Sequence, residues 1–249
     1  MRDSVHAMYR GSGFVSVICG VKDRAEHLFE VLPTWRACPE IGEIVIVDWS
    51  SKDPLYFPCE PLVKVVRVEG EALWQPGPCF NLGLQMVTRP VVIKLDADVM
   101  IKDPAFFTAH PLSPRMFYAG NHQAAKDMNE AHLSGAVYAV LKDLTGVNGY
   151  NERLTTYGYD DDDLYERLML DGVTRLNINH GMLHHIPHED NVRLQSQPKR
   201  ILNVYDEAMF NRSLAHDNPW KKDDEVIQWD IFPEDYELKR VVCRRKLDA

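Results

Sequence analysis

The sequence lacks the marks of several protein classes. Its 249 residues hold five cysteines, an odd number without a Cys-x-x-Cys pair, which argues against a zinc site or disulfide framework and favours a reducing compartment. No apolar run approaches the ~18 residues that span a bilayer, and residues 1–13 have no apolar core of a secretory signal. We therefore expect a soluble, cytoplasmic protein without a transmembrane segment, or alternatively one that is peripheral to a membrane.

Concentrated positive charge is also missing. The net charge is −9 and there is no long basic run, which argues against nucleic acid as a partner. Gly11-Ser12-Gly13 precedes a strand and lacks a third glycine, so it is not a dinucleotide-binding fingerprint. Asn211-Arg212-Ser213 matches a glycosylation sequon, but without a secretory route the match carries little weight.

Hydrophobic periodicity predicts an α/β protein. Apolar runs rich in β-branched residues predict strands at 14–19, 44–47, 63–68, 91–95, 116–120, 136–141 and 173–178, and spacings of three and four predict helices at 24–36, 81–87 and 161–170. This alternation favours a mostly parallel sheet flanked by helices. No linker or repeat divides the chain, so we expect one domain over residues 1–249.

Two carboxylates follow the strand at 91–95 directly. Asp96 and Asp98 therefore fall at the carboxyl edge of the predicted parallel sheet, where ligands collect. Two ionised groups so close repel each other, and a divalent cation relieves that cost. Mn²⁺ and Mg²⁺ accept carboxylate oxygens together with diphosphate oxygens. Asp-x-Asp alone is common by chance, but this placement favours a metal site.

A run of four aspartates, 160–163, opens the helix at 161–170. Helix capping explains one or two of them, but not four adjacent charges. Successive helical residues point about 100° apart, so the four cannot share one role. We expect at least one to face a ligand, Asp163 to face solvent, and the rings of Tyr157 and Tyr159 to stack on a sugar.

Other residues leave two readings open. His184, His185 and His188 suit metal or phosphate contact, with about even odds against an ordinary surface role. Lys22 and Arg24 follow the first strand, where a cation could meet phosphate, although a helix start is an equal explanation for Lys22. Trp74, Phe80 and Asn81 are minor candidates, and both aromatic residues suit a core as well.

Taken in order, these segments resemble the GT-A glycosyltransferases, specifically the family 2 type and the galactosyltransferase C-terminal type. The likeness covers roughly residues 14–190 and is carried by residues 15–18 with 22–24, 43–48 with 50–53, 93–98, and 133–136 with 148–152 and 158–164. It implies the GT-A (nucleotide-diphospho-sugar transferase) fold, with a nucleotide-binding half at 14–110 and an acceptor-binding half at 111–249.

The resemblance also implies roles for single residues. Asp161 becomes the catalytic base. The metal ligands become Asp96, Asp98 and His185, with His188 as a competing ligand. Acceptor contacts fall on Gly135, Tyr157, Asp160 and Asp162. Nucleotide-sugar contacts fall on Gly20, Val21, Arg24, Asp48, Phe80, Asn81, Lys94 and Asp96. The chain departs from the family pattern where a glutamate is replaced by Asp160, a glycine by Tyr159 and a tryptophan by Tyr157.

These roles describe a metal-dependent inverting glycosyltransferase. A UDP-sugar donor, a saccharide or glycoconjugate acceptor and Mn²⁺ or Mg²⁺ are the expected partners. Three alternatives remain: a non-catalytic nucleotide-sugar or carbohydrate-binding module, a nucleotidyltransferase on the same fold, and a retaining transferase. The segment Cys19-Gly20-Val21-Lys22 is too poor in glycine and basic residues to favour the nucleotidyltransferase.

Overall fold

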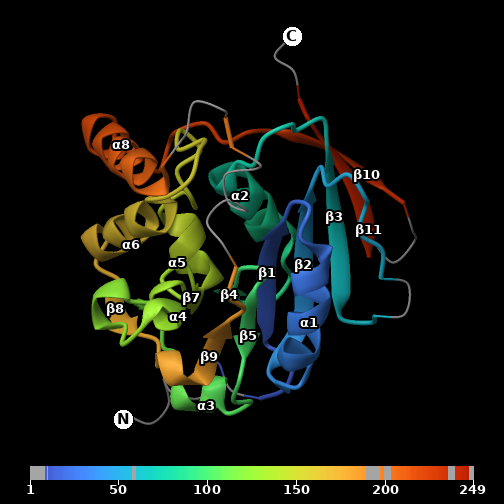
Figure 1. Ribbon diagram of the computed structural model, residues 1–249, viewed down its shortest axis with the longest axis vertical. Coiled ribbons are helices and arrows are strands. Elements are labelled where there is room, and N and C mark those ends of the chain that lie inside the picture. Colours follow the sequence, from blue (N-terminus) through green and yellow to red (C-terminus); the bar gives the residue numbers. More distant parts are fainter. Residues whose placement is uncertain are drawn as a thin grey trace.

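The computed structural model describes residues 9, 11–57, 60–188, 197–198, 203–234 and 239–246 (Figure 1). Within these residues the strands are β1 (Val15–Val21), β2 (Ile41–Trp49), β3 (Val63–Glu69), β4 (Val91–Lys94), β5 (Val99–Ile101), β6 (Met116–Ala119), β7 (Val137–Val140), β8 (Thr174–Asn177), β9 (Leu183–His185), β10 (Trp229–Pro233) and β11 (Arg240–Arg245). The helices are α1 (Ala25–Arg36), α2 (Pro76–Met86), α3 (Phe106–Ala109), α4 (Met128–Ala131), α5 (Leu141–Gly146), α6 (Asp160–Leu170) and α8 (Val204–Asp217).

Nine of these strands form one sheet in the order β10-β11-β3-β2-β1-β4-β7-β6-β8. The centre is parallel: β1 pairs with β2 and β4, and β3 pairs with β2 and β11. Strand β7 is antiparallel to both β4 and β6. The carboxyl ends of β1, β2 and β4 therefore meet at one edge, which is the edge the sequence predicted for ligands.

Apolar residues on both faces of the sheet explain why it is covered by helices. On β1, Val17 and Cys19 belong to the same buried cluster as Trp35 of α1, whereas Ile18 belongs to the cluster on the opposite face. Helix α2 packs so closely against this second face that a Cβ atom at Gly83 would lie 2.6 Å from the side chain of Ile18. Burial on both sides suits β-branched runs and parallel pairing.

The fold prediction is confirmed, with one shifted boundary and several elements that the sequence did not reveal. Helix α2 begins at Pro76 rather than near residue 81, because proline is tolerated in a first helical turn. The last strand, β11, returns to pair with β3 in the predicted nucleotide-binding half, so the sheet does not divide at residue 110. In the described part of the chain, no helix combines the length and apolar character needed to cross a bilayer.

Candidate active site

A cavity of about 320 Å³ opens at the carboxyl edge of the parallel strands. Most of the residues predicted for the site line it, from both predicted halves of the chain: Gly20, Arg24, Phe80, Lys94, Asp96, Asp98, Gly135, Tyr157, Asp160, Asp161, Asp162 and His185. Lys22, Trp74 and Tyr159 line it too. The edge of the sheet thus gathers residues that lie far apart in the sequence, from Gly20 to Ala208.

Asp98 is positioned by a tight turn and a two-stranded pairing. After β4, the amide of Val99 donates to the carbonyl of Asp96 at 3.0 Å, and Val99 begins β5. Strand β5 pairs antiparallel with β9, with Val99 opposite His185, and the amide of Ile186 donates to the carbonyl of Asp98 at 2.7 Å. This pairing places His185 beside Asp98, a contact that no periodicity in the sequence indicates.

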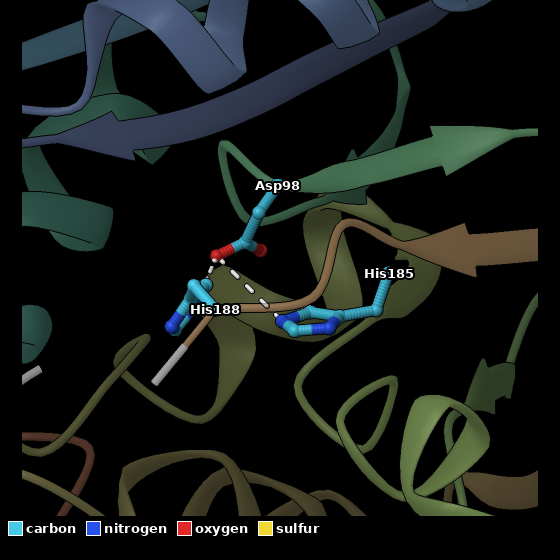
Figure 2. A group of neighbouring side chains, drawn as sticks. All are labelled: Asp98, His185 and His188. Atoms are coloured by element: carbon cyan, nitrogen blue, oxygen red, sulfur yellow. Dashed lines mark hydrogen bonds and ion pairs between the residues drawn. The ribbon is translucent and has the colours of Figure 1, made fainter. Parts of the chain in front are cut away.

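Asp98, His185 and His188 form a compact group (Figure 2). The Oδ2 atom of Asp98 lies 2.9 Å from Nε2 of His188 and 3.8 Å from Nε2 of His185. One ligand atom from each residue lies within 4.8 Å of the other two. Burial disfavours the Asp98 carboxylate, but the hydrogen bond to His188 and the neighbouring His185 and Arg24 outweigh it and lower its pKa to about 2. A carboxylate held ionised between two imidazoles fits a divalent cation.

This group differs from the set expected from sequence, which was Asp96, Asp98 and His185 with His188 as a competitor. The structure brings both histidines to Asp98, so they are neighbours in one group rather than alternatives. Asp96 instead pairs with Lys94, whose Nζ lies 3.0 Å from Oδ1 of Asp96. A metal contact for Asp96 stays a prediction.

Helix α4 orients His185. The side chain of Asn129 accepts from the backbone amide of His185 at 3.2 Å and donates to its carbonyl at 2.5 Å. The ring of His132 packs on that of His185, with centroids 4.7 Å apart. Sequence reasoning missed both residues, because a four-residue helix far from the histidines gives no periodic signal.

Lys94 occupies the centre of the acidic part of the cavity. It is 3% exposed, and its Nζ donates to the carbonyl of Gly135 at 3.0 Å and contacts both carboxylate oxygens of Asp161 at 3.3 Å. Burial opposes its charge, but Asp161 and Asp96 outweigh burial and raise the pKa of Lys94. Gly135 leaves room for this cluster, since a Cβ there would lie 2.8 Å from Asp161 and 2.9 Å from the Lys94 Nζ.

Asp161 is the most perturbed carboxylate of α6. Burial raises its pKa well above the usual range, Lys94 opposes that rise, and Asp160 adds to it. The hydroxyl of Tyr150, which is buried, donates to Oδ1 of Asp161 at 3.2 Å. The contact of Tyr150 with Asp161 was not predicted, because it depends on the packing of the Tyr150 ring against Phe80.

The rest of the acidic run faces different surroundings, as the helical rotation predicts. Asp160 is 8% exposed, and burial raises its pKa to about 6 although Lys94 opposes the rise. Asp162 is exposed at the mouth of the cavity. The expectation that Asp163 faces solvent is wrong: it is 5% exposed and forms an ion pair with Arg167 at 2.8 Å, one helical turn later.

The predicted nucleotide contacts divide into two groups. Gly20, Arg24, Phe80, Lys94 and Asp96 line the cavity, and NH1 of Arg24 lies 3.1 Å from Oδ2 of Asp98. Val21, Asp48 and Asn81 are buried and are not among the lining residues.

Asp48 and Asn81 already have partners within the protein. Asp48 accepts from the amides of Ser51 and Leu55 and pairs with Arg67 at 2.8 Å. Asn81 bonds to the backbone of Tyr150 and to Glu152. Lys22 also lies in such a network, donating to the carbonyls of residues 49, 50 and 71. Nucleotide contact by Asp48 and Asn81 stays a prediction, and the structure gives both a local structural role.

Comparison with known proteins agrees with this geometry. A family model described as the N-terminal domain of galactosyltransferase matches residues 115–189, which include α6, His185 and His188. No curated protein matches the chain. Among solved structures, the catalytic domain of Drosophila β-1,4-galactosyltransferase 7 is similar at TM-score 0.61 and 13% identity, covering 94% of each chain.

Two further structures are less similar. A mannosyltransferase from Pyrobaculum calidifontis reaches TM-score 0.52 and 16% identity over 67% of this chain and 55% of its own. Glucosyl-3-phosphoglycerate synthase from Mycobacterium tuberculosis reaches TM-score 0.52 and 14% identity over 89% of this chain and 85% of its own. The chain has the GT-A glycosyltransferase fold. In this GT-A fold the cavity lies at the edge where the parallel strands end, between β4 and the first turn of α6.

Proposed function

We propose that this protein is a metal-dependent inverting glycosyltransferase that moves a sugar from a UDP-sugar to a hydroxyl of a saccharide acceptor. The observation that carries the proposal is one cavity with two different chemical ends. Asp98 and His185 line one part of it, where His188 completes their carboxylate–imidazole group, and Asp161 with a raised pKa lines another. Its volume suits a small-molecule ligand.

The residues at the first end fit a divalent cation. Two imidazole nitrogens and one ionised carboxylate suit Mn²⁺ better than Mg²⁺, which prefers an all-oxygen shell. When bound, such a cation neutralises the charge of a leaving diphosphate. Arg24 lies at the same oxygen of Asp98 and supplies a second positive charge next to a diphosphate. The similar Drosophila enzyme has been solved with manganese, UDP-Gal and xylobiose, which supports the same ligand classes here.

Asp161 is the proposed base at the other end. It takes the proton of the acceptor hydroxyl while that oxygen attacks the anomeric carbon from the face opposite the diphosphate, and a single displacement inverts that carbon. A raised pKa makes the carboxylate a better proton acceptor near neutral pH. Gly135, Tyr157, Asp160 and Asp162 form the proposed acceptor side of the cavity.

The proposal is tested by titrating UDP into the protein with Mn²⁺ or with EDTA and then identifying the product anomer of a turned-over UDP-sugar. Tighter UDP binding with Mn²⁺ and an inverted product are expected. UDP binding without turnover would indicate a binding module. Release of pyrophosphate would indicate a nucleotidyltransferase, and a product with the anomeric configuration of the donor would indicate a retaining transferase. A cytoplasmic location is part of the same proposal, supported by four free cysteines among the described residues; Cys59 lies outside them.

A further inference from the structure

Helix α8 is hydrogen-bonded to the loop of residues 156–159, which leads into α6. The side chain of Asn211, which is 1% exposed, donates from Nδ2 to the carbonyls of Tyr157 at 3.1 Å and Gly158 at 2.9 Å, with a longer contact to Thr156 at 3.4 Å. One buried amide therefore binds three successive carbonyls of residues 156–158. In Figure 1, α8 lies beside α6, on the opposite side of the molecule from β10 and β11.

Two further contacts join the same surfaces. The hydroxyl of Thr156 donates to Oε1 of Glu207 at 2.6 Å and lies 3.2 Å from Oδ1 of Asn211. Gly158 lies so close to the helix that a Cβ would come within 2.7 Å of the Cβ of Ala208. The loop and α8 are thus in direct backbone-to-helix contact.

The loop adopts a conformation that needs such support. Gly158 has φ +90° and Tyr159 has φ +69°, and the left-handed region is unfavourable for a residue with a side chain. Tyr157, Gly158 and Tyr159 all line the cavity. The contacts of Asn211 therefore fix the backbone from which Tyr157 enters the acceptor side, while the hydroxyl of Tyr159 is also held by Glu166 and His216.

Two contacts of Asp161 come from outside this loop, although Tyr159 caps the first turn of α6. Asp161 is contacted by Lys94 from β4 and by Tyr150 from the loop before residue 156. Loosening residues 156–158 can consequently displace Tyr157, while these two contacts keep Asp161 in place.

The same observation explains the sequon at residues 211–213. The amide nitrogen that glycosylation would modify is buried and bonded to the loop. In the folded protein Asn211 is therefore a structural contact and not an accessible modification site.

We propose that Asn211 is a positioning residue for the acceptor: through α8 it fixes the loop of residues 156–159, and thereby the acceptor specificity of the site. This inference rests on the proposed function. It assigns the C-terminal helix, for which the sequence indicated no role, to acceptor recognition rather than to donor or metal binding.

The test compares Asn211→Leu, which keeps the number and branching of the side-chain heavy atoms but removes the amide, with Thr156→Val, a milder change at the same contact. Ser213→Ala is the matched control, because the Ser213 hydroxyl donates to the carbonyl of Met209 within α8. This substitution removes the sequon but keeps the hydrogen bonds of Asn211 to the loop. Hydrogen exchange of residues 156–160, UDP–Mn²⁺ affinity, hydrolysis of the UDP-sugar by water, and acceptor KM and kcat are measured for each.

For Asn211→Leu we expect faster exchange in the loop and an acceptor KM raised about tenfold or more, as the loss of two to three hydrogen bonds implies. Thr156→Val should also speed hydrogen exchange in the loop and raise the acceptor KM, by smaller factors than Asn211→Leu. Ser213→Ala should match wild type in both measurements. UDP–Mn²⁺ affinity and hydrolysis should stay within about twofold, since no donor contact changes.

Two results would overturn the inference. One is an unchanged acceptor KM despite faster loop exchange, which would mean that the loop does not select the acceptor. The other is a parallel loss of donor affinity, hydrolysis and transfer in both variants, which would make the contact a general structural one. If wild type neither binds UDP–Mn²⁺ nor transfers sugar, the proposed function itself fails, and this inference fails with it.

Discussion

The ammonium of Lys94 lies 3.3 Å from each carboxylate oxygen of Asp161. It is also 3.0 Å from Asp96, so one buried cation joins the motif after β4 to the first turn of α6. A lysine in this position offsets the repulsion among carboxylates that share a poorly solvated cavity. The structure shows the charge of Lys94 directed at the two aspartates, and its expected contact with the nucleotide-sugar stays a prediction.

Replacing Lys94 by methionine should therefore destabilise the protein. Methionine leaves the carboxylates of Asp96 and Asp161 without their cation, and because these side chains are 41% and 23% exposed, the loss should be smaller than the ~3–5 kcal/mol of a fully buried pair. Adding Asp161→Asn to Lys94→Met should recover part of that loss, because it removes one of the stranded carboxylates. Urea unfolding of the four proteins in the cycle measures the coupling, and a double variant no more stable than Lys94→Met would contradict this view of the cluster.

Both histidines of the metal group should matter for cation affinity. His185→Ala and His188→Ala should each weaken Mn²⁺ binding at least tenfold, since even the loss of an outer-shell partner typically costs roughly 10–100-fold. His184→Gln is the matched control: it lies next to His185 in β9, where alternate side chains point to opposite faces. Calorimetric titration with Mn²⁺ measures the affinity of each variant. Normal Mn²⁺ affinity in either alanine variant would show that the replaced histidine is not a metal ligand.

The raised pKa of Asp160 predicts a pH-dependent stability. Burial raises this pKa from 3.8 to about 6, so the folded state binds the proton more tightly than the unfolded state does. Ionisation of Asp160 therefore lowers the free energy of unfolding. This loss is absent below pH 3.8, grows between pH 3.8 and 6, and reaches up to about 3 kcal/mol above pH 6.

Asp160→Asn should consequently raise the free energy of unfolding at pH 8 and change it little at pH 4. Denaturant unfolding in EDTA at both pH values measures the difference while keeping metal out of the comparison. An equal gain at both pH values would show that Asp160 is not held in a poorly solvated environment.

Local signals were enough to predict the fold. The β-branched runs of β1 and β4 and the three- and four-residue spacing around Trp35 in α1 match the structure within a few residues. The placement of Asp96 and Asp98 at the end of β4 followed from the rule that ligands collect where parallel strands end. These features depend on neighbouring residues, which a sequence shows directly.

The missed features depend on long-range packing. The joint role of His185 and His188 requires the β5–β9 pairing, and both strands have only three residues, too few for a periodic signal. The burial of Asp163 depends on Arg167, and that of Asp48 on Arg67 in the adjacent strand. An aspartate in an acidic run gives no indication of which neighbour will pair with it.

The central claim is that Asp161 is the base, and Asp161→Asn tests it most directly. Asparagine keeps the shape of the side chain but cannot take a proton. Transfer should fall by roughly 10²–10⁴, the usual contribution of a positioned base, while UDP–Mn²⁺ affinity stays close to wild type. Asp162→Asn, the same change one residue on at an exposed position of the acceptor side, should raise the acceptor KM and keep most of kcat, because it removes an acceptor contact but not the base. Normal sugar transfer by Asp161→Asn would contradict the account, and if Asp162→Asn alone were inactive the base would belong one position later.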